Sequence, residues 1–157
     1  QVPLHQTPPS LKILLSLTET AAMRMRKNNN MCAVIAVSIK TSGFFKYSHQ
    51  RTLYSATDST EKIFEEIRKT FDEMWNKEPI RQLGVRLTHL CSNEFYQRSF
   101  FDDKNIEKKR ALDKAIDSIR ERFGYESVVR SVFVDSEIKP FSGGNGEDDY
   151  PMMGSIL

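Results

Sequence analysis

The sequence predicts an α+β domain in which two helices cover one face of a four-stranded antiparallel sheet. Apolar residues recur at helical spacing from residue 63 to residue 75, which is typical of an amphipathic helix. Apolar and polar residues alternate at 33–42 and again at 85–88, which is the period of a half-buried strand. With a second helical pattern near the N-terminus, the predicted order is βαββαβ, followed by an accessory C-terminal helix and a flexible tail.

The first two elements are predicted to be a short edge strand and a helix. Residues 1–6 have the character of an extended segment. Thr7 and Pro8 indicate a helix start, because threonine caps an N-terminus and proline fits the first turn without losing a hydrogen bond. The apolar residues at helical spacing in this helix are Leu11, Leu14, Leu15, Ala22 and Met25.

A hairpin and the second helix follow. Residues 33–42 and 46–54 are predicted to be its two arms. Asp58, with Glu61 three residues later, predicts a capping box, and Pro79 ends the helix. The residues expected on the core side of the first arm are Ile35, Val37 and Ile39.

The last strand, residues 79–90, contains an irregularity. Val85 alternates correctly with its neighbours, but Ile80 lies five residues earlier and is out of step. A β-bulge around residues 82–84 would restore the register, since glycine inside a strand often marks a bulge. The residues then expected on the open face of the sheet are Arg81, Arg86 and Thr88.

The formal net charge of +2 is unevenly distributed along the chain. Residues 29–57 and 79–93 contain no acidic residue and five basic ones, Lys40, Lys46, Arg51, Arg81 and Arg86. A sheet that is positive on its uncovered side predicts a polyanionic partner, which favours nucleic acid. The alternative is a solvated surface that only discourages aggregation.

Three segments resemble parts of one protein family. The sequence Ile-Arg-Gln-Leu-Gly-Val-Arg-Leu at 80–87 resembles the last strand of the little finger domain of Y-family (translesion) DNA polymerases. Residues 97–103 (Gln-Arg-Ser-Phe-Phe-Asp-Asp) and 116–124 (Ile-Asp-Ser-Ile-Arg-Glu-Arg-Phe-Gly) extend the resemblance to bacterial UmuC/DinB-type members, the ImpB/MucB/SamB family. The resemblance implies the C-terminal part of a polymerase that acts in the SOS response and DNA repair. It also implies that the catalytic palm and its Mg²⁺ belong to the rest of the polymerase, so we expect no catalytic residue, metal or cofactor in this chain.

The resemblance also implies which residues contact primer–template duplex. Arg81 and Arg86 stand where little fingers carry basic residues that contact template or primer phosphates. Arg51 and its two preceding neighbours match the hairpin arm that does likewise, whereas Gln82 departs from relatives with two adjacent basic residues. The predicted set is Lys40, Lys46, Ser48, His49, Gln50, Arg51, Arg81, Arg86 and Thr88.

Residues 97–101 resemble the sliding-clamp-binding motif of these polymerases, Gln-Leu-Ser-Leu-Phe, with Arg98 and Phe100 in place of leucines. Such a peptide inserts an apolar pair into a groove while glutamine forms hydrogen bonds. The alternative is that the aromatic residues between 95 and 101 pack the third helix onto the domain. The predicted clamp-binding residues are Gln97, Ser99, Phe100 and Phe101.

Composition divides the chain into three parts. Residues 1–91 are predicted to form the DNA-binding domain, 92–134 a clamp-binding connector and helix, and 135–157 a flexible tail. The helix is expected to end at Gly124 in the C′ position, with residues 128–134 extended after it.

Several other classes of function find little support in the sequence. Cys32 and Cys91 lack CxxC spacing and predict free thiols, and the three histidines show no metal-ligand spacing. No apolar run is long enough to span a bilayer, so we expect a cytoplasmic monomer that does not bind membranes.

Two alternatives share the predicted topology, an RRM-like RNA-binding module and a ferredoxin-like protein-interaction domain. An RRM stacks bases on aromatic residues of its central strands. Here Ser38, Lys40 and Arg86 occupy those places. The aromatic residues nearest to them, all at the hairpin, are Phe44, Phe45 and Tyr47.

Overall fold

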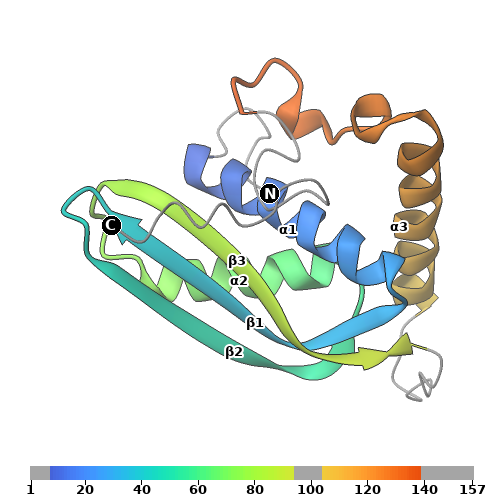
Figure 1. The fold of residues 1–157 in the computed structure, drawn as a ribbon, viewed down its shortest axis with the longest axis horizontal. Helices are drawn as coiled ribbons and strands as arrows, with labels where there is room; N and C mark the ends of the chain where they lie inside the picture. The colour runs from blue at the N-terminus through green and yellow to red at the C-terminus, as the bar shows by residue number, and fades with distance from the viewer. Residues whose placement is uncertain (1–7, 94–103, 139–157) are drawn as a thin grey trace, which may run out of the picture.

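Three α-helices and a three-stranded antiparallel sheet make up the computed structural model, which describes residues 8–93 and 104–138 (Figure 1). The chain order is α1 (Pro9–Lys27), β1 (Asn30–Thr41), β2 (Lys46–Thr57), α2 (Thr60–Met74), β3 (Ile80–Ser92) and α3 (Lys104–Phe123). Two short 3₁₀ helices follow, η3 (Tyr125–Ser127) and η4 (Ser131–Phe133). Within the described part of the chain, no helix is long and apolar enough to cross a bilayer.

The sheet has the strand order β2-β1-β3, with both pairs antiparallel. The predicted helices and the hairpin are therefore confirmed, together with the α+β class. The sheet was predicted to have four strands, and the fourth falls on residues 1–6, which lie outside the described residues.

The core lies between the sheet and the two helices α1 and α2. Ile35, Val37 and Ile39 of β1 are completely buried, as the alternation predicted. They pack with one apolar side of each helix, and β3 adds half-buried residues at the edge of the same cluster. The helix residues in this cluster are Leu14, Ala22, Met25, Ile63, Ile67, Phe71 and Met74. Burying such side chains contributes roughly 1.5–3 kcal/mol each, so this face of the sheet supplies most of the domain's hydrophobic stabilisation.

The predicted bulge in β3 is present, at a position nearer its start. Lys40 pairs with Gln82, but the next residue, Thr41, pairs with Ile80, so Arg81 is the extra residue. As a result Ile80 packs against the core on the same side as Val85. The bulge therefore solves the register problem, but at Arg81 and not at residues 82–84.

The predicted capping box at the start of α2 is wrong. The N-cap residue is Ser59, whose side chain makes no capping hydrogen bond. The Thr60 N–H instead donates to Asp113 Oδ2 of α3 at 2.9 Å. Asp58 is held elsewhere, because Arg110 Nε and Nη2 donate to its two carboxylate oxygens at 2.6 and 2.9 Å. A cap from a distant helix can replace a local one because any correctly placed acceptor satisfies the free N–H group.

Helix α3 docks beside the C-terminal end of α1 through polar contacts (Figure 1). The buried guanidinium of Arg26 donates to both oxygens of Asp117, at 2.6 and 3.1 Å. Its Nη1 also donates to the Asp58 carbonyl and to Thr60 Oγ1, each at 2.8 Å. Arg26 thus joins α1, the start of α2 and α3.

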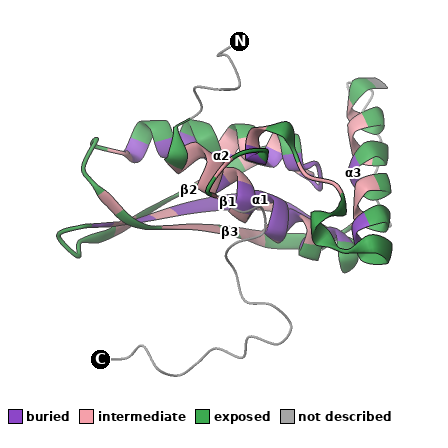
Figure 2. Cartoon of the chain, turned by 90° about the horizontal axis from the view of Figure 1, so that it is seen from above, coloured by how far each residue is buried: buried purple, intermediate pink, exposed green. Residues whose placement is uncertain are grey.

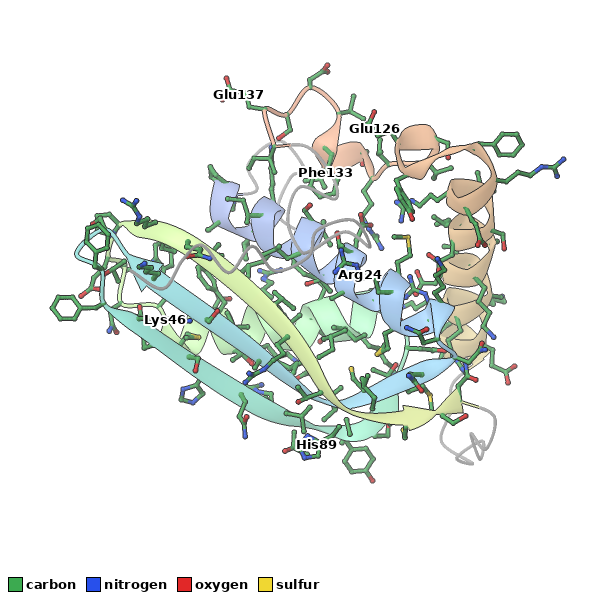
Figure 3. All side chains as sticks on the ribbon, in the orientation of Figure 1. Arg24, Lys46, His89, Glu126, Phe133 and Glu137 are labelled. Atoms are coloured by element: carbon green, nitrogen blue, oxygen red, sulfur yellow. The ribbon has the colours of Figure 1, made fainter. Side chains whose placement is uncertain are left out.

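The segment after α3 folds back toward α1. Gly124 has a φ of 99° and its N–H donates to the Arg120 carbonyl, which confirms the predicted end of the helix. Residues 128–134 were expected to be extended, but η4 forms a helical turn there and buries Phe133 near α1 (Figure 3). Arg130 also pairs with the buried Glu19 of α1. The outer side of α3 remains largely exposed (Figure 2).

Both cysteines are free thiols, as predicted. Cys32 is buried in the core, and this burial raises the pKa of its thiol to about 12. Cys91 is exposed near the end of β3.

Candidate nucleic-acid interface

The face of the sheet opposite α1 and α2 presents four rows of side chains, each running across the three strands. Residues directly opposite each other on neighbouring strands point to the same face. Lys40 of β1 stands between Lys46 and Gln82, and Ala36 stands between Gln50 and Arg86. The remaining rows are Ser48, Ser38 and Gly84, and then Thr52, Val34 and Thr88. This face, named here the open face, unites six of the predicted residues, Lys40, Lys46, Ser48, Gln50, Arg86 and Thr88.

Apart from Lys40, the middle strand of the open face carries short side chains, and longer ones flank it in the row of Gln50 and Arg86. Ala36 and Val34 are buried between their neighbours, whereas Gln50 and Arg86 on either side are exposed. A Cβ at Gly84 would lie 2.5 Å from Ser38 Oγ, so glycine there lets the two strands keep this serine in place. Long polar side chains can therefore reach outward from both outer strands toward a ligand.

Arg81 joins the open face through the bulge. Its guanidinium carbon lies 4.7 Å from the centre of the Phe44 ring, and Lys40 Nζ lies 5.4 Å from the same centre. Since Lys40 belongs to the open face, both cations and this ring meet at its hairpin end. Lys46 also lies near that end of the sheet (Figure 3).

The open face is positive and has no internal counter-charge. The three strands contain no Asp or Glu. Among residues 8–93 and 104–138, no carboxylate forms an ion pair with Lys40, Lys46, Arg81 or Arg86. Four unpaired cations repel one another, and a polyanion would relieve that repulsion.

Arg51 and His49 lie apart from the rest of the predicted set. They are opposite Ile35 and Val37, so they belong to the helix-covered side of β2. Arg51 donates to Glu66 at 3.3 Å and to Glu73 at 2.5 Å, both on α2. The hydrogen bond with Glu73 is the main cause that raises the pKa of Arg51, and the same contact lowers the pKa of Glu73. The charge of Arg51 is therefore largely balanced within the domain.

The open face also contains Gln82 and Thr52, which are not in the predicted set of contact residues. The alternation that begins at Lys46 would have pointed to Thr52, because every second residue of β2 shares this face. Gln82 could not be placed without knowing that the bulge lies at Arg81.

The chain is similar in sequence to proteins of one family. Residues 3–100 match the model of the impB/mucB/samB family C-terminal domain, which is more than half of the chain. The chain is 45% identical over 128 residues to DNA polymerase IV of Clostridium acetobutylicum, which covers 82% of the chain and 32% of that protein. It is 32% identical over 122 residues to DNA polymerase IV 2 of Bacillus subtilis, which covers 76% of the chain and 29% of that protein.

The chain belongs to the impB/mucB/samB family. The chain corresponds to the C-terminal domain of that family. It spans about 30% of the length of the DNA polymerase IV relatives that it matches. The family match covers α1, the three strands and α2, and hence the whole open face. The similarity to the Clostridium acetobutylicum protein is longer than this match, so it continues into the region of α3.

Two further predictions about the family's functional residues concern other parts of the chain. The predicted clamp-binding residues, Gln97, Ser99, Phe100 and Phe101, lie outside the described residues. Within the described part of the chain, no group of three His, Cys, Asp or Glu is placed to hold a metal ion.

Proposed function

We propose that this chain is the DNA-binding domain of a translesion DNA polymerase, and that its open face holds primer–template duplex by the phosphates. The observation that carries the proposal is the gathering of Lys40, Lys46, Arg81 and Arg86 on one side of an acid-free sheet. The hydroxyl and amide side chains between them, on Ser48, Gln50 and Thr88, supply neutral donors for further phosphate oxygens.

Phosphate contacts suit such a polymerase because they carry no sequence information. A domain that holds the backbone alone accepts any template, including a damaged one. The magnesium-dependent catalytic centre of the polymerase would then belong to a part of the protein other than the residues described here. The domain itself would act as a monomer on DNA, within the cytoplasm.

The proposal predicts weak, sequence-independent binding of duplex DNA with a steep dependence on salt. Each phosphate contact releases counterions and adds about −0.9 to the slope of log K against log salt, so four cations predict a slope of about −4. Fluorescence anisotropy with two duplexes of unrelated sequence, from 50 to 300 mM salt, measures both properties. Equal affinity for the two duplexes is expected.

The same titration separates the alternatives. An RRM-like module would prefer single-stranded RNA to duplex DNA, because it reads unstacked bases on aromatic residues of the central strands. A protein-interaction domain would bind neither nucleic acid. A slope of log K against log salt near zero, or no measurable binding to duplex at low salt, would contradict the proposal.

We also propose that residues 97–101 tether the domain to the bacterial sliding clamp. The flanks of this segment support the idea, because β3 ends at Ser92 and α3 begins at Lys104 as a docked helix. A peptide between two anchored elements stays next to the DNA-binding domain, so clamp and duplex could be held together.

If the segment docks on the clamp, Phe100→Ala and Phe101→Ala should each weaken clamp binding by about 1–3 kcal/mol. Their melting temperatures should barely change. The core-packing alternative predicts the reverse, since removing a buried Phe costs about 3–5 kcal/mol of stability. Clamp titration by surface plasmon resonance and thermal melts of the same variants decide between them, and Asp103→Ala, just beyond the motif, is the matched control.

A further inference from the structure

Phe44, in the turn between β1 and β2, is an aromatic residue held on the open face. Its ring is flanked by Arg81 and Lys40, yet the residue is 63% exposed. Both cations lie over the ring and restrict where it can lie, while more than half of the residue's surface stays open to solvent. This open part of the ring is where a flat group could be placed against it.

The backbone of Phe44 makes its presence at this position unusual. Its φ is 68°, in the left-handed region that glycine and asparagine adopt readily and large side chains rarely do. Turn geometry alone would favour glycine or asparagine here. A large aromatic side chain in this conformation suggests that the ring serves a purpose other than folding.

Phe45, the next residue, provides an internal comparison. It is 75% exposed, but its carbonyl accepts from the N–H of Thr41, a residue on the core side of β1. Its ring lies over Gly43, within 3.4 Å of where a Cβ would stand. Among the described residues, no cation lies against the Phe45 ring. Phe44 and Phe45 are therefore similar in chemistry and exposure. They differ in the face of the sheet to which they belong and in whether cations lie against the ring.

We propose that the Phe44 ring stacks on an unpaired base of the single strand that continues from the duplex held on the open face. This inference rests on the proposed function. Single-stranded nucleic acid is the occupant that fits, because cations attract its phosphates while an aromatic face stacks on any base. Three cations, Lys40, Lys46 and Arg81, surround the hairpin end of the face, and the strands carry no acid that would repel a phosphate. Arg81 and Lys40 would remain beside the ring and neutralise the phosphates on either side of the stacked base.

The test compares two DNA ligands with the same duplex, one blunt and one with a 5′ single-stranded extension. The 157-residue chain should bind the extended ligand more tightly, by about 5- to 20-fold. Phe44→Asn should abolish this advantage and leave blunt-duplex affinity within about twofold, since asparagine keeps the left-handed turn. Phe44→Tyr should retain the advantage because it retains the ring. Phe45→Ala is the matched control and should behave as the unchanged protein. The fluorescence of a 2-aminopurine placed in the extension should be quenched on binding to every one of these proteins except Phe44→Asn.

The possible failures can be told apart. If the unchanged chain binds neither ligand, the proposed function itself fails. If it binds both ligands equally, or if Phe44→Asn and Phe45→Ala weaken binding alike, duplex binding stands and the stacking inference is overturned. An advantage for the extension that survives in Phe44→Asn also overturns it and leaves the ring free for a protein partner.

Discussion

Replacing Arg26 by alanine is expected to lower the free energy of unfolding by about 3–5 kcal/mol, because it leaves buried charge without a partner. Arg26 is only 8% exposed and donates to Asp117, to the Asp58 carbonyl and to Thr60 Oγ1. Asp113, whose carboxylate lies 3.6 Å from the same guanidinium, would lose its nearest cation. Urea denaturation followed by circular dichroism measures the change.

Arg24→Ala is the matched control. Arg24 lies two positions before Arg26 in the same last turn of α1, and its side chain is exposed. Its effect should stay within about 0.5 kcal/mol. Arg26→Lys should fall between the two, since lysine keeps the charge but cannot form the paired hydrogen bonds with Asp117. Equal losses for Arg26→Ala and Arg24→Ala would show that α3 is held by something other than this network.

The same network makes the expected effect depend on pH. Burial raises the pKa of Asp113 above its ordinary value, although Arg26 and the Thr60 N–H both oppose this shift. A carboxyl with a raised pKa binds its proton more tightly in the folded state, so its contribution to stability is lost as the pH rises from its ordinary pKa through the folded one. Removing Arg26 raises that pKa further. The destabilisation by Arg26→Ala should therefore be larger at pH 7 than at pH 5.

The parts of the fold that were predictable are those that depend on neighbouring residues in the sequence. Alternation placed Ile35, Val37 and Ile39 in the core, and helical spacing placed Ile63, Ile67 and Phe71 there. Each of these patterns arises from a single element with one buried face, so local periodicity carries the information. The need for a bulge in β3 was visible for the same reason, because Ile80 and Val85 had to face the same side.

What could not be predicted depends on contacts between distant residues. Thr60 and Asp113 are 53 positions apart, and Arg26 and Asp117 are 91 positions apart. Their sequence neighbourhoods contain no sign of the pairing, and a local capping box was the simpler expectation. The position of the bulge belongs to the same class, because it is set by how β3 pairs with β1 and not by β3 alone.

The candidate site lies between these two cases. Lys40, Lys46 and Arg86 followed from strand alternation and from the absence of acids. Arg51 was included by resemblance, although counting from Lys46 places it on the opposite face of β2. Its partners Glu66 and Glu73 come from α2, so a basic residue in a positive segment is here part of a structural ion-pair network. Charge along a strand therefore has to be assigned to a face before it is assigned to a ligand.

Charge reversal on the open face is expected to disrupt duplex binding more than the loss of a single cation. The double variant Arg81→Glu, Arg86→Glu is expected to weaken duplex binding by on the order of 100-fold at 100 mM salt, for all duplex sequences alike. Two phosphate contacts are lost, and two carboxylates are placed against the backbone in their stead. Arg86→Gln alone removes one contact near the middle of β3, and should reduce the slope of log K against log salt by about 1.

Two matched variants make this test specific to the open face. Arg68→Gln removes an exposed arginine from α2, on the helix-covered side of the sheet, where its ion-pair partner among the described residues is Asp72 at 3.9 Å. Arg51→Gln removes a cation from β2 itself, in the strand that also carries Lys46. Both should leave duplex affinity within about twofold, provided that circular dichroism shows an unchanged fold, because neither charge reaches the open face. If Arg51→Gln weakens binding as much as Arg86→Gln while Arg68→Gln does not, the duplex lies along the outer edge of β2 and the surface that contacts DNA has to be redrawn around that edge.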